Sequence, residues 1–277
     1  MKGKAPQFKC KKILEDVSDT LVNRMNLQFL DIIGTNLIRL PPDKIEKFEL
    51  LLFECMKDLI MAEESKKQYL EKENDAIRTV VQPDGVTFQR HGYSFDDPTF
   101  ELKKHFETFL IRCVIAIRKT VKLAEEILGV EFEGPRQLKN YLLNNLPPDS
   151  PYIKMIQEDS VWIKQLYDLR GKAEHDSLFI EDFDVLVKEN QKLQIKLPYL
   201  PMVNKATLRE YMDVTFENTF TYCEDIVAML LNMKCDEKIQ IVLLPENLRP
   251  KHRNFRYVVD LKPEYKKRLL KENKEKK

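Results

Sequence analysis

Hydrophobic residues along most of the chain recur every three or four positions, which places them on one face of a helix. This pattern predicts long helices that end at proline or glycine. The expected helices cover residues 8–40, 43–74, 97–128, 135–146, 151–176 and 205–232. Asp43 and Thr207 are each followed three residues later by a glutamate, so we expect both to cap the helices that follow them. Ser150 is expected to cap the helix that begins at residue 151, and Gly129 to close the helix that ends at residue 128. The highly charged end of the 43–74 helix is expected to project into solvent.

Other segments depart from helical spacing and predict short strands. Residues 86–88 and 93–95 flank a turn region and are candidate strands. Residues 183–198 alternate apolar and polar side chains around a charged turn, which predicts a β-hairpin. Residues 238–244 and 255–261 are two further candidate strands, followed by a charged tail.

These elements predict a mainly α fold, a helical bundle with an N-terminal helical hairpin and small β-hairpin insertions. We divide the chain into an N-terminal hairpin with its connecting loop (1–95), a helical bundle (96–235) and a segment of short strands with a basic tail (236–277). Only seven of 277 residues are glycine and 33% are charged, a composition that favours long helices over sheets with many tight turns. A hydrophobic content of 43% is enough for a sizeable core.

The formal net charge of +1 is unevenly distributed. Residues 1–12 carry five lysines and no acid, and residues 236–277 carry 13 basic and seven acidic side chains. The intervening body therefore has a net charge of −10, which disfavours broad contact with nucleic acid. The two basic ends could bind nucleic acid or fold back on the acidic body.

The sequence predicts a cytoplasmic protein with no membrane segment. Its five cysteines form no CxxC pair and lie mostly in apolar helical stretches, as reduced buried thiols do. Residues 1–12 lack the apolar region of a secretory signal, and no apolar run approaches the roughly 20 residues that span a bilayer.

Several kinds of site are poorly supported. Glu101 and His105 share a helix face at a spacing that can hold a metal, but no third ligand joins them, so we expect neither a metal nor a cofactor. The glycine-rich phosphate loops and the GxSxG nucleophile motif are absent from the sequence. His252 lies in a basic cluster that could contact phosphate or form a solvated turn.

The most informative stretch is Asp168–Asp176, at the end of the 151–176 helix. Arg170 and His175 are separated by four residues, about 140° apart around a helix and ~7.5 Å along it, so a long arginine side chain can still converge with the imidazole on one bound group. Gly171 leaves room beside His175 for a ligand or a second helix, at a cost of roughly 1 kcal/mol relative to alanine.

The same stretch has a purely structural interpretation. Arg170 can pair with Glu174 one turn later along the helix. An exposed face that alternates in sign is also expected, from four residues spaced at i+4: Lys164, Asp168, Lys172 and Asp176. An arginine and a histidine at this spacing are common by chance, so the surrounding context has to decide.

That context resembles the HEPN superfamily (higher eukaryotes and prokaryotes nucleotide-binding). The likeness covers residues 97–235: a long helix, a short helix, a helix that begins at proline and ends in Arg-x4-His, and a further long helix. The stretch Trp162–Ser177 is similar to the motif helix of bacterial HEPN-like proteins of unassigned role.

The resemblance implies specific chemistry. Catalytic members are metal-independent endoribonucleases that work as dimers with both motifs facing one cleft. Carried over, Arg170 would hold the scissile phosphate and His175 would act as general base or acid on the ribose 2′-OH, roles that suit a guanidinium and an imidazole. Gly171, Lys172 and Glu174 are then candidate substrate-binding residues. Gly171 departs from the family, because active members often have a polar residue after the arginine.

Two functions stay open at this stage. One is RNA cleavage in a toxin–antitoxin or phage-defence setting, by a homodimer formed through the Arg170–His175 helix, with an antitoxin as a candidate partner. The other is a non-catalytic HEPN-like module that binds a nucleotide or a protein. A deep basic cleft at the dimer interface would favour the first, and burial of Arg170 against Glu174 with a hydrogen-bonded His175 would favour the second.

Overall fold

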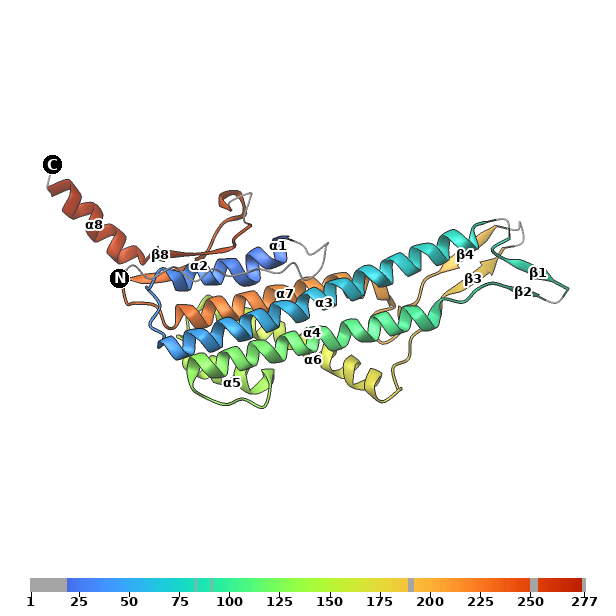
Figure 1. Ribbon diagram of the computed structural model, residues 1–277, viewed down its shortest axis with the longest axis horizontal. Coiled ribbons are helices and arrows are strands. Elements are labelled where there is room, and N and C mark those ends of the chain that lie inside the picture. Colours follow the sequence, from blue (N-terminus) through green and yellow to red (C-terminus); the bar gives the residue numbers. More distant parts are fainter. Residues whose placement is uncertain (1–18, 83, 91, 189–191, 250–253, 276–277) are drawn as a thin grey trace, which may run out of the picture.

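The computed structural model describes residues 19–82, 84–90, 92–188, 192–249 and 254–275. It confirms a mainly α fold in which the strands form only small two-stranded sheets. The molecule is elongated, with two of the small sheets at one end and the C-terminal helix at the other (Figure 1).

The helices follow the hydrophobic periodicity closely. They are α1 (Asp19–Val22), the π-helical turn η1 (Asn23–Leu27), α2 (Gln28–Gly34), α3 (Pro42–Val80), α4 (Thr99–Leu128), α5 (Pro135–Asn145), α6 (Pro151–Glu174), α7 (Leu208–Asn232), the short 3-10 helix η2 (Glu246–Leu248) and α8 (Pro263–Glu275). The long helices α3 and α4 lie antiparallel to each other along most of their length (Figure 1).

The strands pair in sequence as antiparallel ribbons. They are β1 (Thr87–Gln89) with β2 (Gly92–Ser94), β3 (Asp184–Val187) with β4 (Leu193–Lys196), β5 (Tyr199–Leu200) with β6 (Ala206–Thr207), and β7 (Ile239–Leu243) with β8 (Tyr257–Leu261). The β3–β4 pair confirms the hairpin predicted within residues 183–198, and β7–β8 confirms the two predicted strands near the C-terminus. The β5–β6 pair was not predicted, since each strand has only two residues.

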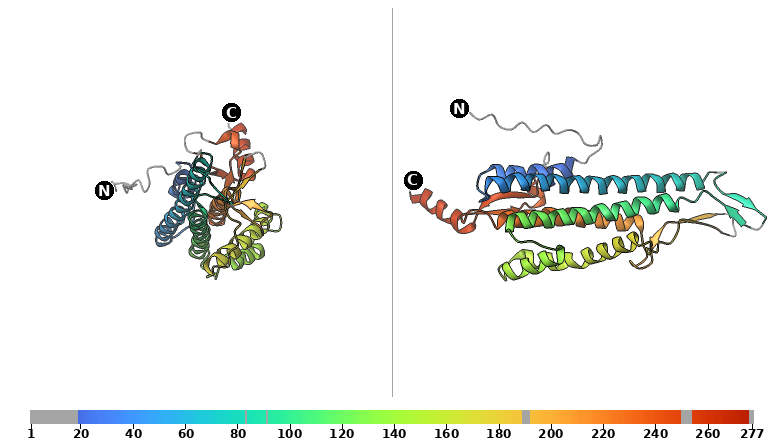
Figure 2. Two further views of the ribbon diagram at one scale, coloured as in Figure 1. Left: turned by 90° about the vertical axis from the view of Figure 1, so that its right-hand side faces the viewer. Right: turned by 60° about the horizontal axis from the view of Figure 1, so that its bottom comes forward.

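The helices stack in three layers: α2 with α3, then α4 with α7, then α5 with α6 (Figure 2, right). One continuous hydrophobic core extends from Leu21 to Tyr257. Helix α4 contributes most of its apolar face to this core, including the fully buried Phe106 and Phe109. The domain boundaries that we placed at residues 95 and 235 stay a prediction.

Three of the predicted helix caps are present. Thr207 and Glu210 form a capping box at the start of α7. Ser150 accepts a hydrogen bond from the backbone N–H of Tyr152 at the start of α6. Gly129 ends α4 with a φ of 73°, the left-handed conformation that glycine adopts without steric cost.

The prediction that Asp43 caps α3 was wrong. The helix begins one residue earlier, at Pro42, and the residue before it, Pro41, makes no side-chain cap. Proline suits the first helical position because its ring fixes φ near the helical value and its missing N–H would have no partner there. Asp43 therefore lies inside the first turn, where its charge still favours the helix N-terminus.

The charged end of α3 was expected to project into solvent, and this holds for only one of its faces. Tyr69 and Glu73 on the opposite face are fully buried. The Tyr69 hydroxyl donates to the Glu73 carboxylate over 3.0 Å, and Arg209 of α7 forms an ion pair with the same carboxylate. Burial raises the pKa of Glu73, and the Arg209 charge opposes that rise.

The first predicted helix, residues 8–40, lies partly outside the described residues. Its described part ends at Gly34 rather than at the prolines. Beyond it, Ile38 forms an isolated β-bridge with Cys235, next to β7. This bridge ties the connection between α2 and α3 to the C-terminal segment.

A buried polar cluster joins α2, α7 and β8. Glu224 of α7 is fully buried and forms ion pairs with Arg24 and Arg256. Gln28 donates to Glu224 over 3.2 Å and accepts the backbone N–H groups of Arg256 and Tyr257. The sequence left open whether the basic C-terminal segment binds nucleic acid or folds back on the acidic body. Arg256 folds back on the body, where it pairs with Glu224.

Candidate functional site

Helix α6 positions the Arg-x4-His motif at its C-terminal end. Ser150 and Pro151 fix where the helix begins, and Leu166 and Leu169 turn one of its faces into the core. The helix was predicted to end at residue 176 and ends at Glu174, two residues earlier. Arg170 thus lies in the last helical turns, whereas His175 is the C-cap residue.

The turn that follows has the geometry of a Schellman motif. The N–H of Ser177 donates to the carbonyl of Lys172 over 2.9 Å, and the N–H of Asp176 donates to Ala173 over 3.4 Å. Asp176 adopts a φ of 49°, the left-handed position that glycine usually occupies. His175 is therefore presented by a hydrogen-bonded turn rather than by regular helix.

Arg170 is engaged within its own helix. Its guanidinium forms an ion pair with Glu174, and the side chain is 24% exposed. Its Nε is buried and makes no hydrogen bond to any described residue. The predicted Arg170–Glu174 pair therefore forms. The predicted alternating face does not form ion pairs within the described residues, although its four members are all exposed: Lys164, Asp168, Lys172 and Asp176.

His175 is exposed, and its imidazole makes no hydrogen bond within the ranges that the structure describes. No hydrogen bond or ion pair joins it to Arg170 in that part of the chain. Two features were expected of a non-catalytic module: an Arg170–Glu174 pair and an internally hydrogen-bonded His175. The structure has the first but not the second.

Gly171 and Lys172, the two residues that follow Arg170, differ in their surroundings. A Cβ placed on Gly171 would meet nothing within 4 Å, so the space beside it is filled by no other part of the described chain. Lys172 is exposed, and its Nζ lies 3.4 Å from Met202 Sδ in the turn between β5 and β6.

Charged residues of helix α4 also lie near the motif helix. The Arg118 guanidinium lies over the Tyr167 ring, 5.8 Å from its centroid. Burial raises the pKa of Tyr167, and the charges of Arg118 and Arg170 oppose that rise. Farther along, burial raises the pKa of Glu107, Lys103 opposes it, and the nearby Asp176 raises it further.

The other candidate residues do not assemble into a site. Glu101 lies 4.0 Å from Lys104 in an ion pair, and no group of three metal-ligating side chains exists among the described residues. His252 and Cys10 lie outside the described residues. Cys55, Cys113 and Cys223 are buried thiols, as predicted, whereas Cys235 is half-buried.

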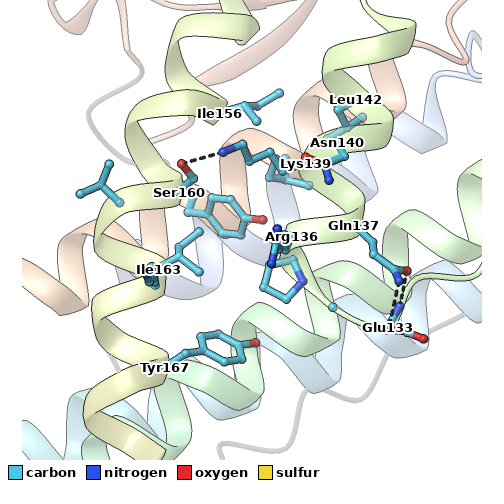
Figure 3. Close-up of a pocket in the computed structure, with 16 residues that line it drawn as sticks. Glu133, Arg136, Gln137, Lys139, Asn140, Leu142, Ile156, Ser160, Ile163 and Tyr167 are labelled. Atoms are coloured by element: carbon cyan, nitrogen blue, oxygen red, sulfur yellow. Dashed lines mark hydrogen bonds between the residues drawn. The ribbon is translucent and has the colours of Figure 1, made fainter.

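A groove of about 1030 Å³, which was not predicted from the sequence, lies between α5 and α6 (Figure 3). Its lining includes basic, aromatic and aliphatic side chains from three helices: Arg136, Lys139, Lys164, Tyr167, Tyr222, Ile156, Ile163 and Ile226. Arg170 and His175 do not line it, although Tyr167 lies only one turn before Arg170. The sequence gives no sign of this groove, because it depends on how far apart α5 and α6 lie.

Comparison with family models, curated proteins and solved structures finds no match for this chain. Within the described ranges, no helix has the length and apolar character needed to cross a bilayer.

Proposed function

We propose that this chain is a HEPN-like cytoplasmic protein that cleaves RNA without a metal ion, as a homodimer in which the ends of α6 face each other. The observation that carries the proposal is the exposed imidazole of His175, held in a hydrogen-bonded turn beside the open space at Gly171. A general base must reach the proton that it removes, and an exposed side chain on an ordered turn meets that requirement.

The reaction assigns one role to each motif residue. His175 removes the proton of a ribose 2′-OH, whose oxygen attacks the adjacent phosphorus. The bond to the 5′ oxygen of the next nucleotide breaks, that oxygen takes up a proton, and a 2′,3′-cyclic phosphate remains. Arg170 holds the phosphate in its planar fork, while Lys172 adds positive charge near the site. Glu174 is the partner of Arg170 until the phosphate replaces it.

Incubation of mixed RNA with the purified protein in EDTA tests this proposal. We expect the wild type to produce 2′,3′-cyclic phosphate ends and His175→Ala to produce none, with the same melting temperature for both because the imidazole is exposed. His105→Ala, on α4, is the matched control and should cleave like the wild type. Cleavage by His175→Ala, or none by the wild type dimer, would overturn the proposal.

A second candidate function is supported by a different observation, the Arg170–Glu174 ion pair. An arginine already neutralised by a carboxylate suits a non-catalytic module that binds a nucleotide or a protein such as an antitoxin. A protein of this kind would dimerise or bind its partner normally after His175→Ala and would release no cyclic phosphate ends before or after the substitution.

A further inference from the structure

The groove between α5 and α6 has the composition of a small-molecule site. Its volume of about 1030 Å³ is at the upper end of the range for ligand pockets, which combine apolar walls with a few polar groups. Ile156, Ser160, Ile163 and Tyr167 recur along one face of α6 and form one wall (Figure 3). Tyr222 and Ile226 of α7 also line the groove, so α7 contributes a third side to it.

Positive charge surrounds this apolar interior. Arg136 and Lys164 line the groove from opposite helices, are exposed, and form no ion pair with a described acid. Lys139 reaches across the groove from α5 and donates to Ser160 Oγ over 3.0 Å (Figure 3). The one acidic residue of the lining, Glu133, accepts a hydrogen bond from Gln137 over 2.8 Å.

The charge balance is notable because the body of the chain is acidic. Residues 13–235 have a net charge of −10, whereas the groove lining carries three basic residues and one acid. Such a local reversal attracts an anion to this position on an otherwise repulsive surface.

A buried polar atom in the lining is also poorly satisfied. The Tyr167 hydroxyl is influenced by Arg118 of α4 but is buried and makes no hydrogen bond of good geometry within the described residues, and its side chain points from α6 toward the groove (Figure 3). A buried hydroxyl without a well-formed hydrogen bond is destabilising, so an acceptor atom supplied by a ligand would be favoured at this position.

We propose that this groove binds a small organic anion, a phosphate or carboxylate head carried on a flat or aliphatic apolar body. The head lies between Arg136 and Lys164, and the body covers the isoleucines and Tyr222. The proposal does not rest on the proposed function, because neither Arg170 nor His175 lines the groove. Failure of the RNA cleavage assay therefore leaves it unaffected.

Methyl NMR of full-length protein labelled at isoleucine locates binding directly. The probes are adenosine 5′-monophosphate and decanoate, with adenosine and decanol as their uncharged counterparts. We expect at least one anion to shift the methyl signals of Ile156, Ile163 and Ile226 with one site per chain, leaving Ile60 and Ile77 of α3, in the layer on the opposite side of the bundle, unshifted. Binding by the monophosphate alone indicates a flat body, and binding by decanoate alone indicates an aliphatic one.

Variants separate the head-group contacts from general charge. Arg136→Glu with Lys164→Glu should weaken the binding anion at least tenfold. The control, Lys57→Glu with Lys72→Glu, makes a similar charge change at exposed positions of α3 and should leave the affinity within twofold. Tyr167→Phe should weaken binding several-fold, because it removes the hydroxyl offered to the ligand, and its melting temperature checks that the fold is kept.

Three results would overturn the proposal. The first is the absence of any shift at the groove isoleucines with either anion at millimolar concentration. The second is equal affinity for the anions and their uncharged counterparts. The third is an equal loss of affinity in the groove variant and in the α3 control, since the effect would then come from net charge alone.

Discussion

Arg170 and Glu174 form an ion pair one helical turn apart at the end of α6, so the guanidinium to which we assign a phosphate in the proposed reaction already has a carboxylate partner. The pair is partly exposed, with side-chain exposures of 24% and 36%. Pairs of this kind contribute only about 0.2–1 kcal/mol, which a doubly charged phosphate group can outcompete. In the proposed reaction, Glu174 therefore competes with the substrate phosphate for the Arg170 guanidinium.

Glu174→Gln should strengthen RNA binding. Removing the competing carboxylate leaves Arg170 available, so we expect a two- to fivefold lower Kd and a lower KM with unchanged kcat, measured by fluorescence anisotropy and by cleavage. Glu158→Gln is the matched control, because Glu158 pairs with Lys154 at the same spacing on the same helix. Weaker binding after Glu174→Gln would mean that the carboxylate itself holds the substrate.

Gly171→Ala should stabilise the isolated chain. A Cβ at this position meets nothing within 4 Å, and alanine gains about 1 kcal/mol over glycine inside a helix, which raises the melting temperature by about 2–4 °C. Thermal unfolding monitored by circular dichroism measures this gain. If RNA or a second α6 helix uses the space, cleavage or dimerisation should fall in the same variant. Lower stability would show that the helix is strained at this point.

Asp225 should make stability depend on pH. Burial raises its pKa to about 6, although Arg256 and the Tyr257 hydroxyl, 2.6 Å away, oppose the rise. The native protein then binds this proton more tightly than the unfolded chain, whose pKa is near 3.8. The free energy of unfolding should therefore fall as pH rises from about 4 to 6, by at most about 3 kcal/mol, and then level off.

Urea denaturation between pH 4 and 8 measures this contribution. Asp225→Asn keeps an oxygen that can accept from Tyr257 but cannot ionise, so we expect it to lose the fall between pH 4 and 6. Asp260 is a control with the opposite pH dependence. The hydrogen bond from Lys266 lowers the pKa of Asp260, so this carboxylate stabilises the fold at pH values above its unfolded pKa of 3.8, and the stabilisation is lost as pH falls. Identical pH profiles for wild type and Asp225→Asn would contradict the prediction.

Gln28→Ala should loosen β8 from the helices. Gln28 Oε1 accepts the backbone N–H groups of Arg256 and Tyr257, at 2.5 and 2.8 Å. Losing this acceptor leaves two N–H groups unsatisfied at a cost of about 2–4 kcal/mol, with faster hydrogen exchange in residues 255–261. Gln68→Ala is the control, because Gln68 is exposed and its side-chain amide donates to Glu64 on the same helix. A decrease of less than about 1 kcal/mol in the free energy of unfolding would indicate that water replaces the Gln28 amide as the acceptor.

The sequence by itself determined the local elements. Hydrophobic spacing located the long helices, and Ser150, Thr207 and Gly129 marked three of their ends because each acts on the backbone within a few residues. Alternation located the β3–β4 hairpin for the same reason. The predicted cap at Asp43 was wrong because Pro42 fits the first helical position better.

The candidate site was only partly predictable. The sequence identified Arg170 and His175 and raised the Arg170–Glu174 pair as one alternative, since both depend on spacing along a single helix. It did not indicate that His175 would form the C-cap of α6, with Asp176 in a left-handed conformation after it. That outcome depends on where the chain leaves the helix to reach the buried Leu178 and Ile180.

Only the tertiary structure decided how distant segments meet. Glu224 is buried because Arg24 and Arg256, about 200 and 32 residues away in sequence, supply its charge partners. The groove exists because α5 and α6 lie far enough apart for Tyr222 of α7 to line the space between them. The local sequence pattern determines which face of a helix is apolar. Which segment packs against that face, and whether a cavity remains between them, depends on how segments far apart in the sequence pack together.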